Sequence, residues 1–170
     1  MHSRRLYPSF LQNHFPSFVR KLTLSGWGLP WEATTIIGLL LNLEVLKLKW
    51  RHAFYGKDWK PTEGEFPRLK FLLLECLELE DWIVDSTHFQ RLERPVIKNC
   101  EHLKEISHSI GDIPTLQIIE MDDSSPLAVN SAEKLLENQL DLGNDVLHLH
   151  IQEFVIQDCP LKYCKFIQIV

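Results

Sequence analysis

The chain has 170 residues, of which 45% are hydrophobic and 24% are charged, and its formal net charge is −5. This share of apolar side chains is sufficient for a packed core, so it excludes a wholly disordered chain. The net negative charge gives no electrostatic footprint for nucleic acid, and we predict no nucleic-acid partner.

Residues 1–14 are predicted to be an N-terminal lead-in rather than a secretory signal, because no apolar run follows their basic residues. The longest apolar stretch, around Ile36 to Leu41, is too short to cross a bilayer, so we expect no membrane span. The cysteines are expected to be buried thiols in a reducing, cytoplasmic setting rather than disulfides. The four cysteines are Cys76, Cys100, Cys159 and Cys164.

A repeated frame of apolar residues organises residues 15–127. Each frame reads apolar-x-x-apolar-x-apolar, and successive frames begin 24, 26, 23 and 24 residues apart. This period lies within the range of about 20–29 residues that is typical of leucine-rich repeats. The five frames begin at Val19, Leu43, Leu69, Leu92 and Leu116.

The frames predict an α/β fold, namely a leucine-rich-repeat solenoid. Short parallel β-strands would line its concave side, and loops and short helices would form its convex side. An ordinary α/β domain with leucine-rich strands is the alternative. In the fourth frame Pro95 replaces an inward aliphatic residue and has no backbone N–H, so that strand should pair less well with its neighbours.

Residues 128–151 are predicted to form a closing helix and strand. The helix is expected over residues 131–139 and is ended by Gly143 and Asn144. The strand is expected over residues 146–151. Residues 152–170 are either a divergent tail or a partial sixth repeat, whose frame would begin at Ile151.

Several segments resemble a known family in their amino-acid sequence as well as in their repeat period. They are Phe18–Gly26, Leu43–Lys49, Glu65–Leu72 and Ile113–Glu120. These segments resemble the last repeats of plant nucleotide-binding leucine-rich-repeat receptors (NLRs). The likeness is closest to the coiled-coil class of nightshades, the late-blight-resistance type, and it covers residues 15–151.

The resemblance implies the C-terminal leucine-rich-repeat region of a disease-resistance protein. Such repeats would sense a pathogen effector or a guarded host protein. They would restrain the receptor's own nucleotide-binding domain until a defense response, such as the hypersensitive response, begins. ATP or ADP would belong to an upstream nucleotide-binding domain, because this chain lacks the Gly-x-x-x-x-Gly-Lys-Ser/Thr loop. We therefore predict no cofactor in this chain. The alternative is a stand-alone leucine-rich-repeat adaptor, such as a substrate-recognition subunit of a ubiquitin ligase.

The predicted partner site is the concave face. Side chains alternate along a strand, so the third, fifth and seventh frame positions would point away from the core. An exposed apolar stripe flanked by charges would result, which is what a protein interface requires. The alternative is that another part of a larger protein covers this stripe. The predicted partner-binding residues are Val45, Lys47, Lys49, Phe71, Leu73, Glu75, Arg94, Val96, Lys98, Ile118 and Glu120, and the same face would carry Lys21, Thr23, Ser25 and Asp122.

No catalytic or metal site is predicted, and we do not expect an enzyme, because no Gly-x-Ser-x-Gly elbow or paired cysteine and histidine signature is present. A zinc site is the rival interpretation of one cluster, but its cysteine spacing is loose, and two surface histidines with two structural cysteines are favoured. The five tryptophans are expected to pack rather than to form a ligand cage. The rival zinc cluster consists of His148, His150, Cys159 and Cys164.

Overall fold

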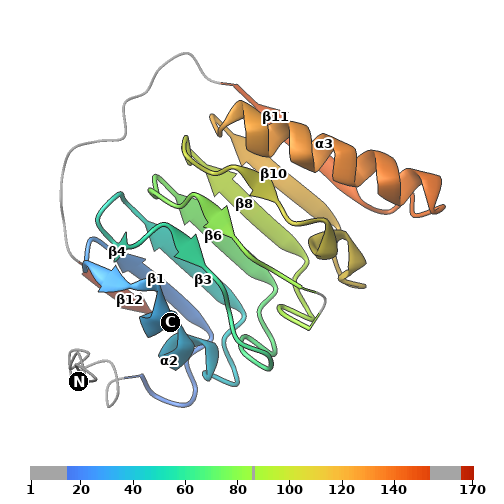
Figure 1. Ribbon diagram of the computed structural model, residues 1–170. Coiled ribbons are helices and arrows are strands. Elements are labelled where there is room, and N and C mark those ends of the chain that lie inside the picture. The colour runs from blue at the N-terminus through green and yellow to red at the C-terminus, as the bar shows by residue number, and fades with distance from the viewer. Residues whose placement is uncertain (1–14, 86, 154–165) are drawn as a thin grey trace, which may run out of the picture.

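The computed structural model describes residues 15–85, 87–153 and 166–170, and its fold is of mixed α/β class. One layer is a seven-stranded sheet with the strand order β11-β10-β8-β6-β3-β1-β12 (Figure 1). Neighbouring strands are parallel, except that β12 runs antiparallel to β1. The strands of this large sheet are β1 (Lys21–Ser25), β3 (Val45–Lys49), β6 (Phe71–Glu75), β8 (Arg94–Lys98), β10 (Ile118–Asp122), β11 (His148–Gln152) and β12 (Phe166–Ile169).

Each of the five apolar frames forms one strand of the large sheet, and consecutive strands pair in register. The register sets Leu22 beside Leu46 and Leu46 beside Leu72, so one frame position recurs as a continuous row. These three side chains are at most 1% exposed. A single strand cannot cover its own inward leucines, so their burial depends on the strand on each side.

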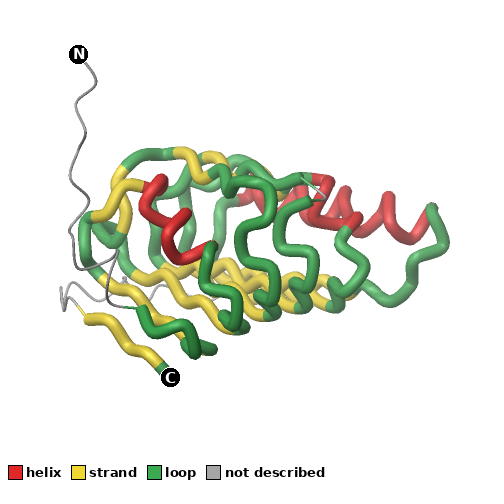
Figure 2. The backbone as a smooth tube through the Cα atoms, turned by 90° about the horizontal axis from the view of Figure 1, so that it is seen from below, coloured by secondary structure: helices red, strands yellow, loops and turns green. Residues whose placement is uncertain are grey.

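The segments that return between these strands form a second layer. Figure 2 shows the large sheet along one side and the helices on the other. Two small parallel sheets lie in the return segments, with the strand orders β2-β4 and β5-β7-β9. Their elements are β2 (Leu29–Pro30), η1 (Trp31–Ala33), α2 (Thr34–Gly38), β4 (Phe54–Tyr55), β5 (Asp58–Trp59), β7 (Asp81–Trp82), β9 (Glu105–Ile106), η2 (His108–Asp112) and α3 (Pro126–Asp141). Within the described ranges, no helix is both long enough and apolar enough to span a membrane.

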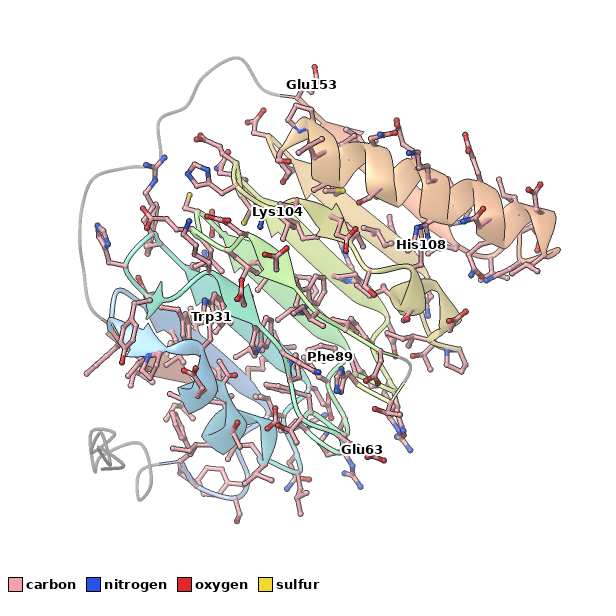
Figure 3. All side chains as sticks on the ribbon, in the orientation of Figure 1. Trp31, Glu63, Phe89, Lys104, His108 and Glu153 are labelled. Carbon is pink, nitrogen blue, oxygen red and sulfur yellow. The ribbon has the colours of Figure 1, made fainter. Side chains whose placement is uncertain are left out.

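Aromatic side chains fill the space between the two layers. The rings of Trp31 and Trp59 stack with centroids 5.2 Å apart, and those of Trp59 and Trp82 stack at 6.1 Å. Trp31 and Phe89 are labelled in Figure 3, and both are at most 4% exposed. The Trp59 indole N–H donates to the Thr34 hydroxyl at 2.9 Å, so this polar group is satisfied inside the core. These three tryptophans therefore have the packing role that we predicted.

A residue with left-handed backbone conformation follows each of the five strands β1, β3, β6, β8 and β10. Its φ is 66° at Gly26, 78° at Trp50, 54° at Cys76, 50° at Asn99 and 42° at Asp123. The backbone N–H of Trp50 donates to the carbonyl at the end of the next strand at 2.8 Å, and the last three residues do the same at 2.8–3.0 Å. This repeated hydrogen bond holds the backbone in a conformation that residues other than glycine rarely adopt.

Pro95 shortens the ladder of one strand pair, as its missing N–H predicts. The β10–β8 register covers three residue pairs and begins at Val96, whereas β8 pairs with β6 over five residues. Because alternate residues direct their backbone groups to opposite neighbours, Pro95 withholds its donor from β10 and not from β6. The pairing with β6 and the burial of Pro95 keep the strand in place.

The helix α3 is longer than the sequence predicted and begins five residues earlier, at Pro126. The Ser125 hydroxyl accepts a hydrogen bond from the Ala128 N–H at 3.3 Å, and proline is well tolerated at a first helical position. The helix is followed by Gly143, whose φ of 82° suits a helix end. It packs against β9, η2 and β11 and thereby closes the far end of the core.

The sixth parallel strand lies in a different frame from the predicted one. Ile151 pairs with Met121 and Leu149 pairs with Ile119, so Ile151 takes the last position of a frame instead of the first. The strand predicted over residues 146–151 is thus present as β11, whereas a frame that begins at Ile151 would place its strand after β11. Its remaining positions from residue 154 lie outside the described residues.

The tail also contributes a strand that the sequence did not predict. β12 lies at the opposite end of the sheet from β11 and pairs with β1 (Figure 1). The chain therefore returns to its own first repeat, and the outer edge of β1 is covered.

We predict that Trp59→Ala strongly destabilises the protein. Trp59 is 1% exposed at the centre of the aromatic stack, so its removal leaves a cavity and should cost about 3–5 kcal/mol of unfolding free energy. Urea denaturation followed by circular dichroism measures this loss. Phe18→Ala is the matched control, because Phe18 is 72% exposed and should change the free energy by less than about 0.5 kcal/mol. Similar losses for both variants would contradict a core built on this stack.

We also predict different stabilities for two substitutions at Asn99. Its φ of 50° favours glycine, so Asn99→Ala should be less stable than Asn99→Gly by about 1–2 kcal/mol. Both variants lose the Asn99 side-chain contact with the Cys76 sulfur equally, so their difference isolates the backbone conformation. Equal urea midpoints would show that the strand end relaxes without a left-handed residue.

Candidate functional site

The outer face of the large sheet, which is turned away from the core, contains the predicted partner site. The strand register places its side chains in rows that cross the strands. One row contains Lys47, Leu73, Val96 and Glu120. A second row contains Lys49, Glu75, Lys98 and Asp122, and a third begins with Val45, Phe71 and Arg94. Sequence positions about 24 residues apart are thus direct neighbours on this face.

The apolar stripe is less exposed than the sequence predicted. Val96 is 8% exposed and counts as buried, because Leu73 and Glu120 flank it in the sheet. Ser25 was expected to point outward and is instead 0% exposed. Arg94 is exposed, and the remaining predicted residues are half-buried, namely Val45, Lys47, Lys49, Phe71, Leu73, Glu75, Lys98, Ile118 and Glu120.

Phe71 forms the centre of a small charged cluster. The Lys47 ammonium lies 5.8 Å from the centroid of the Phe71 ring, and the Arg94 guanidinium lies 5.9 Å from it. Arg94 also forms an ion pair with Glu120 at 2.6 Å. An exposed cation over an aromatic ring contributes about 0.5–1 kcal/mol, so these contacts position the side chains more than they stabilise the fold.

A hollow of about 370 Å³ opens beside Phe71. Its floor comes from β1, β3 and β6, and β12 closes one side. Sequence reasoning missed the contribution of β12, although the alternation in Ile167-x-Ile169 was a signal for a strand. The lining residues are Lys21, Thr23, Val45, Lys47, Phe71, Gln168 and Val170.

Among the described residues, the basic side chains of this hollow are not neutralised by the protein. Lys21 and Lys47 have no carboxylate within ion-pair distance in the described ranges, whereas Lys49 pairs with Glu75 at 2.8 Å. The hollow therefore combines an aromatic surface with two available cations. Such a surface favours an acidic protein segment that also carries an apolar side chain.

A larger hollow of about 730 Å³ is lined by residues of the return segments that follow the strands β1, β3, β6 and β8. Glu80 there forms ion pairs with Lys57 and, at 3.2 Å, with Lys104. The hydrogen bonds from Lys57 and then Lys104 lower the pKa of Glu80, so its carboxylate is already neutralised by neighbouring cations. This second hollow has charges of both signs, and its charged lining residues are Arg51, Lys57, Glu78 and Glu80.

The zinc alternative gains no support from the described part of the chain. His148 and His150 lie on the outer face of β11, opposite Ile118 and Glu120 in the register. The described residues contain no group of three or more histidine, cysteine or acidic side chains that could hold a metal ion. Cys159 and Cys164 lie outside the described residues.

The cysteines differ from the expectation that all four are thiols. Cys76 is disulfide-bonded, so the prediction was wrong for this residue. Disulfides persist mainly in oxidising compartments, so the cysteines no longer favour a cytoplasmic location. Cys100 is free and buried, as expected. Burial raises the pKa of the Cys100 thiol to about 12.

Comparison with known proteins gives a group of similar plant sequences, whereas no protein-family profile matches the chain. The chain is 42% identical over 102 residues to the late blight resistance protein homolog R1B-16 of Solanum demissum. It is 37% identical over 124 residues to homolog R1B-13 and 35% identical over 129 residues to homolog R1B-11 of the same species. These matches cover 60%, 72% and 75% of this chain, respectively.

The relatives are disease-resistance protein homologs by name. This confirms the late-blight-resistance part of the predicted resemblance, whereas its assignment to the C-terminal repeats of an NLR stays a prediction. The chain spans only 8%, 11% and 10% of the lengths of these three relatives.

We predict that Cys100 makes the stability of the protein depend on alkaline pH. Its pKa rises from 9.0 in an ordinary thiol to about 12 in the fold, so folding favours the protonated form. The contribution is fully present below pH 9.0 and is lost as the pH rises toward 12. Urea midpoints of the wild type should therefore fall between pH 9 and pH 10.5 more steeply than those of Cys100→Ala. Parallel pH profiles would contradict the raised pKa.

Proposed function

We propose that this chain is a leucine-rich-repeat segment that acts as a protein-binding surface in a plant disease-resistance protein. The observation that carries the proposal is the 35–42% identity to late blight resistance protein homologs over 60–75% of the chain. The repeated frame and the in-register parallel strands support a repeat solenoid, because each strand buries its leucines only against its neighbours.

The outer face is the proposed contact surface. Phe71, Val45 and Leu73 offer half-buried apolar area next to one another, and basic side chains surround this area. Protein interfaces have such a composition, with an aromatic anchor at the centre and a charged rim. The partner would be a protein: a pathogen effector, a guarded host protein or the receptor's own nucleotide-binding domain.

We infer that the chain contributes to resistance by contact and not by chemistry. The outer face groups cations with apolar side chains, and two of its acids, Glu75 and Glu120, are held in ion pairs by Lys49 and Arg94. Carboxylates held in this way are poorly placed to serve as a general base. The cytoplasmic location predicted from the sequence stays a prediction, and imaging of a fluorescently tagged chain in leaf cells would test it.

We predict that the double variant Lys47→Glu/Phe71→Ala loses the resistance function without losing the fold. The test silences the gene in its host plant, re-expresses each variant and measures lesion area after infection with the late blight pathogen. Silencing should enlarge the lesions, the wild type should reduce them again, and the double variant should not, because the aromatic anchor and the cation beside it are absent.

The matched control is Lys60→Glu/Ile83→Ala, which makes a comparable change in exposed residues outside the outer face. Ile83 is 45% exposed and Lys60 is exposed, so this control should restore resistance. Urea midpoints of both variants establish that each one folds. Full restoration by the outer-face variant would exclude this face as the contact surface, and no effect of silencing would exclude the disease-resistance role.

A further inference from the structure

The outer edge of β1 is occupied by a strand from the far end of the chain. Figure 1 shows β12 beside β1, and the register pairs Leu22 with Ile169 and Leu24 with Ile167 in antiparallel orientation. The Lys21 N–H donates to the Val170 carbonyl at 2.8 Å, and the Val170 N–H donates to the Lys21 carbonyl at 2.9 Å. The edge of the sheet is therefore satisfied by backbone hydrogen bonds within this chain.

The side chains of β12 follow the same alternation as those of the repeats. Ile167 and Ile169 face the core side with Leu24 and Leu22, whereas Gln168 lies with Thr23 on the outer face. An apolar residue at every second position is therefore what the edge of β1 accommodates. The orientation of β12 is antiparallel, so its pairing with β1 depends on the alternation of apolar side chains and not on the repeat frame.

β12 is held less firmly than the strands inside the sheet. Ile167 packs against the core, but Ile169 remains 38% exposed and Val170 remains 64% exposed. The corresponding inward residues of β3, Leu46 and Leu48, are 0% exposed. β12 also has a neighbour on one side only. Backbone hydrogen bonds and the partly buried Ile167 hold this strand, so it is more easily displaced than the strands inside the sheet.

We propose that the outer edge of β1 is a strand-acceptor site and that β12 is its exchangeable occupant. The ligand is an extended segment of a partner protein, with apolar side chains at alternate positions, that binds antiparallel to β1 after displacing β12. This is recognition by strand addition, in which main-chain hydrogen bonds give affinity and alternate side chains give specificity. The proposal is independent of the disease-resistance role, because it concerns the edge of the sheet and not its outer face.

The same edge has a second consequence for a longer array. A preceding repeat would place its parallel strand against β1, at the position that β12 fills. Only one strand can pair with this edge at a time. Pairing of β1 with β12, with a preceding repeat or with a partner strand is therefore mutually exclusive, and a partner strand binds only when β12 is released.

The first test uses the full chain and a labelled peptide with the sequence Lys-Phe-Ile-Gln-Ile-Val, which copies residues 165–170. The variant Ile167→Asp/Ile169→Asp should release β12, because it places charges on the core side of the strand. Fluorescence anisotropy should show that this variant binds the peptide at least about tenfold more tightly than the wild type does, since the tethered strand competes in the wild type at a high effective concentration.

Two matched controls make the binding test specific. The variant Gln168→Asp changes the outer side of β12, so its edge should stay closed and bind the peptide as weakly as the wild type. A peptide with aspartate at both isoleucine positions should not bind the open variant. Equal binding of the peptide to the wild type and to the open variant, or equal binding of the two peptides, would overturn the proposal.

Hydrogen exchange of single amides supplies the second test. The backbone of Lys21 faces β12, whereas alternation turns the amides of Leu22 and Leu24 toward β3. The Lys21 amide should exchange slowly in the wild type, rapidly in the open variant and slowly again when the peptide is added. The Leu22 and Leu24 amides should stay protected throughout, which shows that the repeats remain folded.

A single substitution keeps the test decisive if the double variant unfolds. Ile169→Asp changes a residue that is already 38% exposed, so the repeats should tolerate it, and it should still weaken β12. Faster exchange at Lys21 with peptide-dependent protection supports the proposal in this variant. Rapid exchange at Lys21 in the wild type, or no protection by the peptide in either variant, would overturn it.

Discussion

The fold depends on the contact between equivalent leucines of consecutive strands. Leu22, Leu46 and Leu72 stand in one row, and each is covered by the residue one repeat away. Full burial of such a side chain is worth about 1.5–3 kcal/mol, but only when both neighbouring strands are present. The interior strands obtain this cover from one another. The two ends of the sheet cannot, and they are where the chain departs from its repeat, with α3 at one end and β12 at the other.

The same stacking determines the surface that faces outward. In-register pairing brings Lys47, Phe71 and Arg94 together from three strands, although long stretches of sequence separate them. It also sets Val96 between two larger neighbours, which removes it from the surface. Substitution at these outward positions can thus change the chemistry of the outer face, while the buried leucines keep the backbone unchanged.

Much of this structure was predictable because it is local or periodic. The positions of the five repeat strands and the inward leucines follow from apolar spacing along the chain, and packing was the predicted role of Trp31, Trp59 and Trp82. The outward residues of the site were identified by alternation, with Val96 and Ser25 as the errors. The shortened pairing at Pro95 followed from the chemistry of one residue that lacks an N–H.

The sequence by itself determined the repeat period, the strands and the outward alternation, since each depends on the spacing of apolar residues along the chain. Tertiary structure alone decided the left-handed conformation of Trp50 and Cys76, because the hydrogen bond that imposes it comes from the next strand. It also decided that β12 pairs with β1, since contact between segments so distant in sequence depends on which sheet edge remains open. Periodicity identifies the side chains with which each repeat contacts its neighbours. Only the assembled sheet shows which edge has no neighbouring repeat strand.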